Sequence, residues 1–179
     1  MFKNFSIEKI IIFLFTVIMA FAVYRILTAD IKITLIPHIT AVNFLYQMRF
    51  EFIPGIGYRE AGSLFIIGQS CIGARLFICL FLILSICRID NYEGFLKKIG
   101  RIFLFCITAV FLAYIITVFR ITASIPFCRL ENFQLIHTIF SLMVYFASGI
   151  GLYTFLSYKS EKKIINKEEW KIWRNYWFL

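Results

Sequence analysis

Three residues that are far apart in the chain, Cys71, Arg120 and His137, carry side chains that can act together on a carbonyl group. A cysteine attacks as the thiolate, and a nearby cation or a helix N-terminus lowers the pKa of its thiol. A guanidinium remains charged at a partly dry interface, where it can hold the thiolate or the oxyanion of an acyl intermediate. An imidazole can move protons near neutral pH. These residue types together indicate covalent acyl transfer, and we predict them as the catalytic residues.

Each of these side chains also has a plainer interpretation. A lone cysteine in an apolar helix is usually a packing residue, and an arginine at a helix end can simply extend to the interface. A histidine there is often hydrogen-bonded to a neighbour. Arg75 follows Cys71 by four residues, which predicts the same helical face one turn deeper. It could tune the thiol in place of Arg120 or only extend toward the interface, and we favour the second.

The composition indicates that these residues must be positioned within a membrane. The chain has 179 residues, 61% of them apolar and 16% charged, and its mean hydropathy is +0.83. A soluble domain of this size carries more charge. The net charge of +9 comes from basic residues next to apolar runs, which membrane topology explains better than a nucleic-acid partner does. The predicted fold class is therefore all-α, an integral membrane helical bundle in a single domain, 1–179.

A helix that crosses a membrane needs roughly 20 mainly apolar residues. Four stretches meet this requirement, at about 7–29, 69–89, 101–119 and 136–158. The first could also be a signal peptide, but its long apolar centre and poor cleavage site favour a retained anchor. The aromatic segment 30–68 is typical of an outer interfacial segment, and the basic tail 159–179 of a cytoplasmic helix.

The distribution of basic residues predicts the orientation. If the N-terminus is cytoplasmic, twelve of the 19 basic residues fall on the inner side, near the N-terminus, in the loop 88–101 and in the tail. We therefore expect a multi-pass protein of a prokaryotic cell membrane with both termini in the cytoplasm. The second predicted helix then begins, the third ends and the fourth begins at the outer face. Cys71, Arg120 and His137 would share that depth.

The residues around these three positions resemble known motifs. Ser70-Cys71-Ile72-Gly73, followed by Phe77, resembles the cysteine motif of the exosortase/archaeosortase family. Phe119-Arg120-Ile121 is similar to its arginine motif, although Thr117 stands where many members carry asparagine. Ile136-His137-Thr138, followed by Tyr145, is similar to its histidine motif. The likeness covers about 62–156, and the four-span layout is most similar to the short exosortase K type.

This resemblance implies a membrane-embedded cysteine peptidase or transpeptidase. Such enzymes recognise a C-terminal signal made of a short motif, a transmembrane helix and a basic cluster. They cut near the motif on the outer face and pass the acyl group to a surface acceptor, such as a glycan or lipid. Cys71 would be the nucleophile, Arg120 the stabiliser of the thiolate or transition state, and His137 the proton shuttle. No metal, no organic cofactor and no nucleic acid is indicated.

Two other functions fit parts of the sequence. In a four-helix membrane thiol oxidoreductase, Cys71 and Cys128 could pair on the outer side, although the sequence has no close-spaced redox pair. In a non-enzymatic assembly protein, the small residues in 147–151 would only pack helices closely. Replacement of Cys128 should inactivate an oxidoreductase but not a sortase-like enzyme. Replacement of Cys71 should inactivate a sortase-like enzyme but not an assembly protein.

Overall fold

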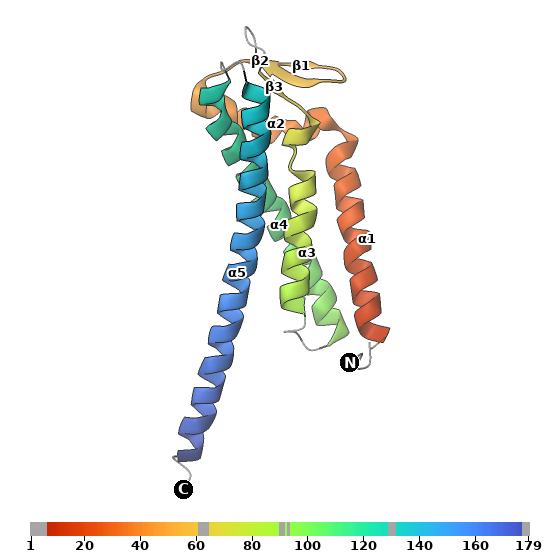
Figure 1. Ribbon diagram of the computed structural model, residues 1–179. Helices are drawn as coiled ribbons and strands as arrows, with labels where there is room; N and C mark the ends of the chain where they lie inside the picture. The colour runs from red at the N-terminus through yellow and green to blue at the C-terminus, as the bar shows by residue number, and fades with distance from the viewer. Residues whose placement is uncertain (1–6, 61–64, 90–91, 93, 129–131, 177–179) are drawn as a thin grey trace.

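The computed structural model describes residues 7–60, 65–89, 92, 94–128 and 132–176 (Figure 1). Within these residues, four helical segments are long and apolar enough to cross a membrane, which confirms the predicted all-α membrane bundle. The spans are Ile7–Ala29, Gln69–Arg88, Phe95–Phe127 and Leu135–Tyr158. Lys3, which we used to predict the orientation, lies outside the described residues. So do residues 177–179 of the predicted basic tail.

The long helices are α1 (Ile7–Ala29), α3 (Ala74–Arg88), α4 (Phe95–Ser124) and α5 (Phe133–Tyr176). α1 has the predicted bounds, whereas α4 extends beyond 101–119 at both ends. α5 continues without a break through the basic tail, so the tail is helical as expected. Lysine and glutamate are good helix formers, and the change of polarity near residue 159 therefore ends the apolar run without ending the helix.

The segment between α1 and α3 forms a helix and a small sheet. The carboxylate of Asp30 accepts a hydrogen bond from the amide of Ile33 at 3.1 Å and caps α2 (Ile31–Tyr46). At 1.5 Å per residue these 16 residues are too short to span a bilayer, and α2 instead crosses the end of the bundle (Figure 1). Three antiparallel strands follow, β1 (Phe50–Ile53), β2 (Gly57–Glu60) and β3 (Ile66–Ile67). This sheet is an addition to the predicted all-helical fold.

Two apolar clusters hold the elements together. The first surrounds α3, which packs on α1, α4 and α5, and in it Phe77 and Phe81 stack with their ring centroids 5.7 Å apart. The second lies where α2, the sheet and the end of α4 meet. It contains Cys71, in a short 3-10 turn, η1 (Gln69–Cys71), that connects β3 to α3. The predicted nucleophile is thus held by the second cluster.

Candidate active site

The turn that carries Cys71 differs from the sequence prediction. Cys71 was expected to head the second spanning helix, but α3 begins only at Ala74, after Gly73 in a left-handed conformation (φ 77°). The amide of Cys71 donates to the carbonyl oxygen of Gly68 at 2.9 Å, which closes the 3-10 turn. The side chain of Cys71 is 4% exposed. The free amides at the start of α3 therefore belong to the residues after Gly73 and not to Cys71.

Position 73 has no room for a side chain. In the structure a Cβ at this position would collide with Oγ1 of Thr117 and would lie 3.4 Å from the carbonyl oxygen of Ala113. Thr117 is fully buried on α4. Gly73 is thus required by its left-handed backbone and by the close contact of the turn with α4.

Arg120 links the cysteine turn to α5. Although it is only 3% exposed, its guanidinium donates from Nη2 to the carbonyl oxygen of Ser70 at 3.2 Å. From Nη1 it donates to the hydroxyl of Tyr145 at 2.6 Å, and its Cζ lies 5.1 Å from the centroid of that ring. Its Nε is buried without a hydrogen-bond partner among the described residues. The arginine therefore lies against the residue that immediately precedes Cys71.

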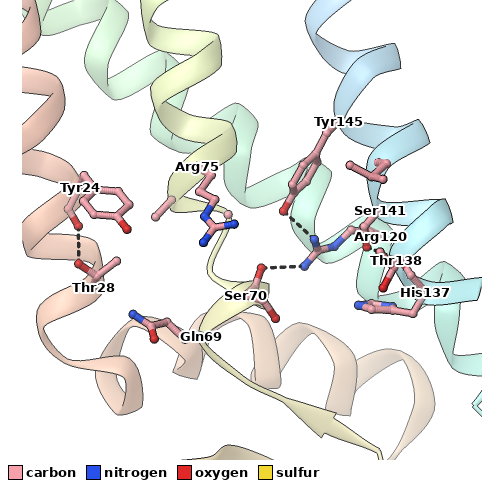
Figure 2. A pocket seen from close by; sticks show the side chains of 13 residues that line it. Tyr24, Thr28, Gln69, Ser70, Arg75, Arg120, His137, Thr138, Ser141 and Tyr145 are labelled. Carbon is pink, nitrogen blue, oxygen red and sulfur yellow. Dashed lines mark hydrogen bonds between the residues drawn. The ribbon is translucent and has the colours of Figure 1, made fainter. Parts of the chain in front are cut away.

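A polar cavity of about 490 Å³ opens beside this arginine (Figure 2). α1 supplies one wall and α5 the opposite wall, while the cysteine turn and the start of α3 lie between them. Most of its side chains are hydroxyl, amide or cationic, and none of the described lining residues is a carboxylate. The lining residues are Tyr24, Thr28, Gln69, Ser70, Gly73, Ala74, Arg75, Arg120, His137, Thr138, Ser141, Leu142 and Tyr145.

His137 lies on the α5 wall of the same cavity. Its ring is 5.6 Å from the ring of Phe133, and its backbone oxygen accepts a hydrogen bond from Ser141. Its Nδ1 is buried without a partner among the residues that the structure describes, and its ring lies within electrostatic range of Arg120. The structure therefore brings Arg120 and His137 to one cavity, as the shared depth predicted.

Cys71 is next to this cavity but is not one of its lining residues. Ser70 and Gly73, which flank it, do line the cavity, and the Oγ of Ser70 is 3.9 Å from the sulfur. The phenol of Tyr145 lies within electrostatic range of Cys71 as well as of Arg120. Cys71 thus belongs to the second apolar cluster and lies beside the cavity that Arg120 and His137 line.

Arg75, which we expected to extend toward the interface, lines the cavity. Its side chain is exposed, and Figure 2 shows its guanidinium directed into the space between α1 and Ser70. The predicted spacing of one helical turn from Cys71 does not hold, because Gly73 interrupts the helix between them. Arg75 is therefore a second cation in the same cavity as Arg120.

His38 was missed by the sequence analysis. It is 3% exposed on α2, with its Nδ1 3.3 Å from the oxygen of Thr34 and its ring edge-to-face with Tyr114. With Gly73 it lines a second, mainly apolar cavity of about 630 Å³. Burial, with a smaller effect of the charge of Arg120, lowers the pKa of His38 to about 4, although the hydrogen bond to Thr34 acts in the opposite direction. Its helical spacing with the buried Leu35 and Val42 is the one signal that could have revealed it.

The five cysteines are free thiols in the structure. Cys128, at the end of η3 (Ile125–Phe127), packs against the second cluster, which contains Cys71. Among the described residues, no group of three histidine, cysteine, aspartate or glutamate side chains is placed to hold a metal ion.

In comparisons with known proteins, no family model, curated protein or solved structure matches this chain. The likeness to the exosortase/archaeosortase family therefore rests on the three motifs, and the function must be argued from the geometry of the cavity.

Proposed function

We propose that this protein is a membrane-embedded cysteine peptidase or transpeptidase that cleaves the C-terminal sorting signals of secreted proteins at the outer face of the cell membrane. The observation that carries the proposal is the hydrogen bond from Arg120 to the carbonyl oxygen of Ser70, the residue before Cys71. This bond brings a buried guanidinium to the cysteine turn, and His137 lines the same cavity. Residues from three separate elements thereby surround one site that is large enough for a peptide segment.

In the first half of the proposed reaction, the thiolate of Cys71 attacks the carbonyl carbon of the scissile peptide bond. The carbonyl oxygen takes the electron pair and becomes an oxyanion, which the guanidinium of Arg120 stabilises. The carbon–nitrogen bond then breaks, and protonated His137 gives its proton to the leaving amine. The products are a thioester on Cys71 and the released C-terminal segment, which carries the transmembrane helix.

In the second half, an acceptor hydroxyl or amine, or water, attacks the thioester carbon. His137, now neutral, removes the proton of the attacking group, and the sulfur leaves as the thiolate. The acyl group ends on the acceptor, and His137 is again protonated for the next cycle. A transpeptidase and a peptidase differ only in which nucleophile enters the cavity at this stage.

The buried position of Cys71 adds a requirement to this mechanism. The sulfur has to turn from the second cluster toward the cavity when substrate binds. The turn that carries it lies between Gly68 and Gly73. Backbone amides hold the carbonyl oxygens of Gly68, Gln69 and Gly73, whereas the side chain of Arg120 holds that of Ser70. A substrate that accepts the hydrogen bond of the Arg120 guanidinium would release the carbonyl oxygen of Ser70 and permit this movement. Short loops at active sites often have such a gating role.

The test uses Cys71→Ala with Cys79→Ala as its matched control, since Cys79 lies on α3, the helix that follows the cysteine turn, and is exposed. Processing is followed by mass spectrometry of a secreted protein of the same organism that ends in a motif, an apolar helix and a basic cluster. We expect Cys71→Ala to abolish processing at normal protein level, and Cys79→Ala to retain it. Processing by the Cys71→Ala variant would refute the proposal.

Cys128→Ser decides between the proposed function and a thiol oxidoreductase. The packing of Cys128 against the cluster that contains Cys71 is the observation that favours the oxidoreductase. A peptidase should keep its activity in Cys128→Ser, because the reaction above uses one sulfur. An oxidoreductase should lose its activity, because a disulfide needs both. A protein whose cellular role survives replacement of either cysteine would be a non-enzymatic assembly protein.

A further inference from the structure

The cavity holds more positive charge than its surroundings balance. Two guanidinium groups, from Arg75 and Arg120, face it, and none of its described lining residues is acidic. The partners of Arg120 are a carbonyl oxygen and a phenol, both neutral. A charge at membrane depth is costly unless an opposite charge or a set of hydrogen bonds compensates it. A cysteine thiolate would balance one of the two cations and leave the other.

Arg75 is the cation that remains available for a ligand. It is the second residue of α3, and Gly73, at the N-cap position, has no side chain to bond the first amides of that helix. These amides add a partial positive charge on the same side of the cavity, where Gly73 and Ala74 also line it. Figure 2 shows the guanidinium of Arg75 between Tyr24 on α1 and Ser70 on the cysteine turn.

The surrounding groups supply further donors. The hydroxyl of Thr28 donates to the backbone carbonyl oxygen of Tyr24 at 2.8 Å. The side-chain amide of Gln69 and the phenol of Tyr24 face the cavity. On the far side, Arg120 is 97% buried and its Nε has no partner among the described residues. A tetrahedral anion with several acceptor oxygens would satisfy donors that converge from these different directions.

We propose that Arg75, with the amides of the first turn of α3, forms a phosphate-binding subsite. A guanidinium fork matches two phosphate oxygens, and basic pockets between membrane helices bind the head groups of anionic lipids. The span that contains Arg75 begins at Gln69, so the subsite lies at the end of the apolar layer, where lipid phosphates are found. The phosphate comes either from a membrane phospholipid or from free inorganic phosphate. This subsite does not depend on the reaction proposed for Cys71.

The test measures binding by the full-length protein in nanodiscs and detergent. Native mass spectrometry counts phosphatidylglycerol retained from nanodiscs. Phosphatidylcholine, whose phosphate is offset by its own choline cation, is the zwitterionic control. Thermal unfolding measures the shift produced by inorganic phosphate against chloride at equal ionic strength. The variant is Arg75→Gln. Its matched control is Arg25→Gln, because Arg25 is also an exposed arginine of a spanning helix but packs over Phe21 outside the cavity lining.

We expect Arg75→Gln to weaken phosphate-group binding by about tenfold or more, and Arg25→Gln to leave it unchanged. Retention of phosphatidylglycerol by the wild type identifies a lipid head group, whereas a shift with inorganic phosphate alone identifies the free ion. If Arg75→Gln does not fold, Arg75→Lys takes its place. This variant keeps a cation but loses the planar fork, and it should bind phosphate more weakly than the wild type. Absence of both forms of binding in the wild type, or equal losses in the Arg75 and Arg25 variants, would overturn the proposal.

Discussion

The guanidinium of Arg120 is held by one partner from the cysteine turn and one from α5, so its position depends on both. In the proposed reaction, substrate would displace the carbonyl oxygen of Ser70, whereas the hydroxyl of Tyr145 would stay bonded to the guanidinium. Tyr145 is therefore a positioning residue for Arg120. Its ring also lies against the guanidinium and would hold the arginine in part even without the hydroxyl.

Tyr145→Phe should lower kcat about tenfold with little change in KM, because the arginine keeps its charge and its ring contact but loses one fixed hydrogen bond. The measurement is steady-state processing of the secreted substrate. Tyr153→Phe is the control, since this tyrosine is exposed farther along α5. A change confined to KM, or equal losses in the two variants, would show that Tyr145 does not position Arg120.

Arg120→Lys should reduce activity by about a hundredfold or more. An ammonium can neither reach both Ser70 and Tyr145 nor present two parallel N–H groups to an oxyanion. Protein level and thermal unfolding should be recorded beside the processing assay, so that loss of activity is separated from loss of fold. Near-normal activity of this well-folded variant would exclude a guanidinium-specific role.

His38 gives the protein a stability that depends on pH. Its pKa is about 4 in the folded protein and about 6.5 when unfolded, so the unfolded chain binds more protons between these values. The contribution of His38 to the free energy of unfolding is fully present above about pH 6.5 and is lost as the pH falls toward 4. His38→Phe keeps an aromatic ring against Tyr114 and should reduce the loss of thermal stability between pH 7.5 and pH 5. An identical loss in the variant and the wild type would contradict this.

At the scale of elements, the cysteine turn is fixed by its contact with α4. Gly73→Ala should lower the free energy of unfolding by more than about 2 kcal/mol, because a left-handed alanine costs about 1–2 kcal/mol and its methyl group would meet Thr117. The double variant Gly73→Ala with Thr117→Ala should recover the steric part, which a double-mutant cycle measures. Gly100→Ala, in the second turn of α4 with nothing within 4 Å of the added Cβ, is the control and should be neutral or stabilising. Equal effects at both glycines would refute this account of the turn.

Apolar runs predicted the number and order of the spanning helices, since length and hydrophobicity are what a bilayer selects. They did not predict the start of α4, because helix formation extends through Lys97 and Lys98 ahead of the apolar run. The strands were missed because each has only two to four residues. Cys71 lies outside α3 because Gly73 has a positive φ. The sequence alone does not show which φ a glycine adopts.

The sequence predicted only that part of the candidate site that follows from the order and orientation of the spanning helices. The order of spans and the basic residues placed Arg120 and His137 at the same depth, and the structure puts them in one cavity. The pairing of Arg120 with Tyr145 and the burial of His38 arise from packing between elements distant in sequence. No local pattern encodes such contacts. The assignment of catalytic roles to Cys71, Arg120 and His137 stays a prediction for the variants above to test.

At the scale of the whole molecule, the predicted orientation can be tested by chemical labelling. Ile56→Cys lies in the exposed turn between β1 and β2, and Lys97→Cys is exposed near the start of α4, at the opposite end of the bundle. With cytoplasmic termini, a membrane-impermeant maleimide added to intact cells should label the first and spare the second until the cells are opened, after subtraction of wild-type labelling. The reverse pattern would invert the proposed topology and place the cavity on the cytoplasmic side.

The two walls of the cavity, α1 and α5, stand on either side of α3, and the small sheet lies over the start of α3 (Figure 1). In the proposed function, a polypeptide anchored in the membrane would enter between these walls from the lipid and not from the aqueous phase. Confinement to a layer about 3 nm thick makes a tethered chain far more concentrated than a dissolved one. A free peptide with the right cleavage motif would therefore compete poorly, and the anchor that a protein carries would count for more in its selection than the bond that is cut.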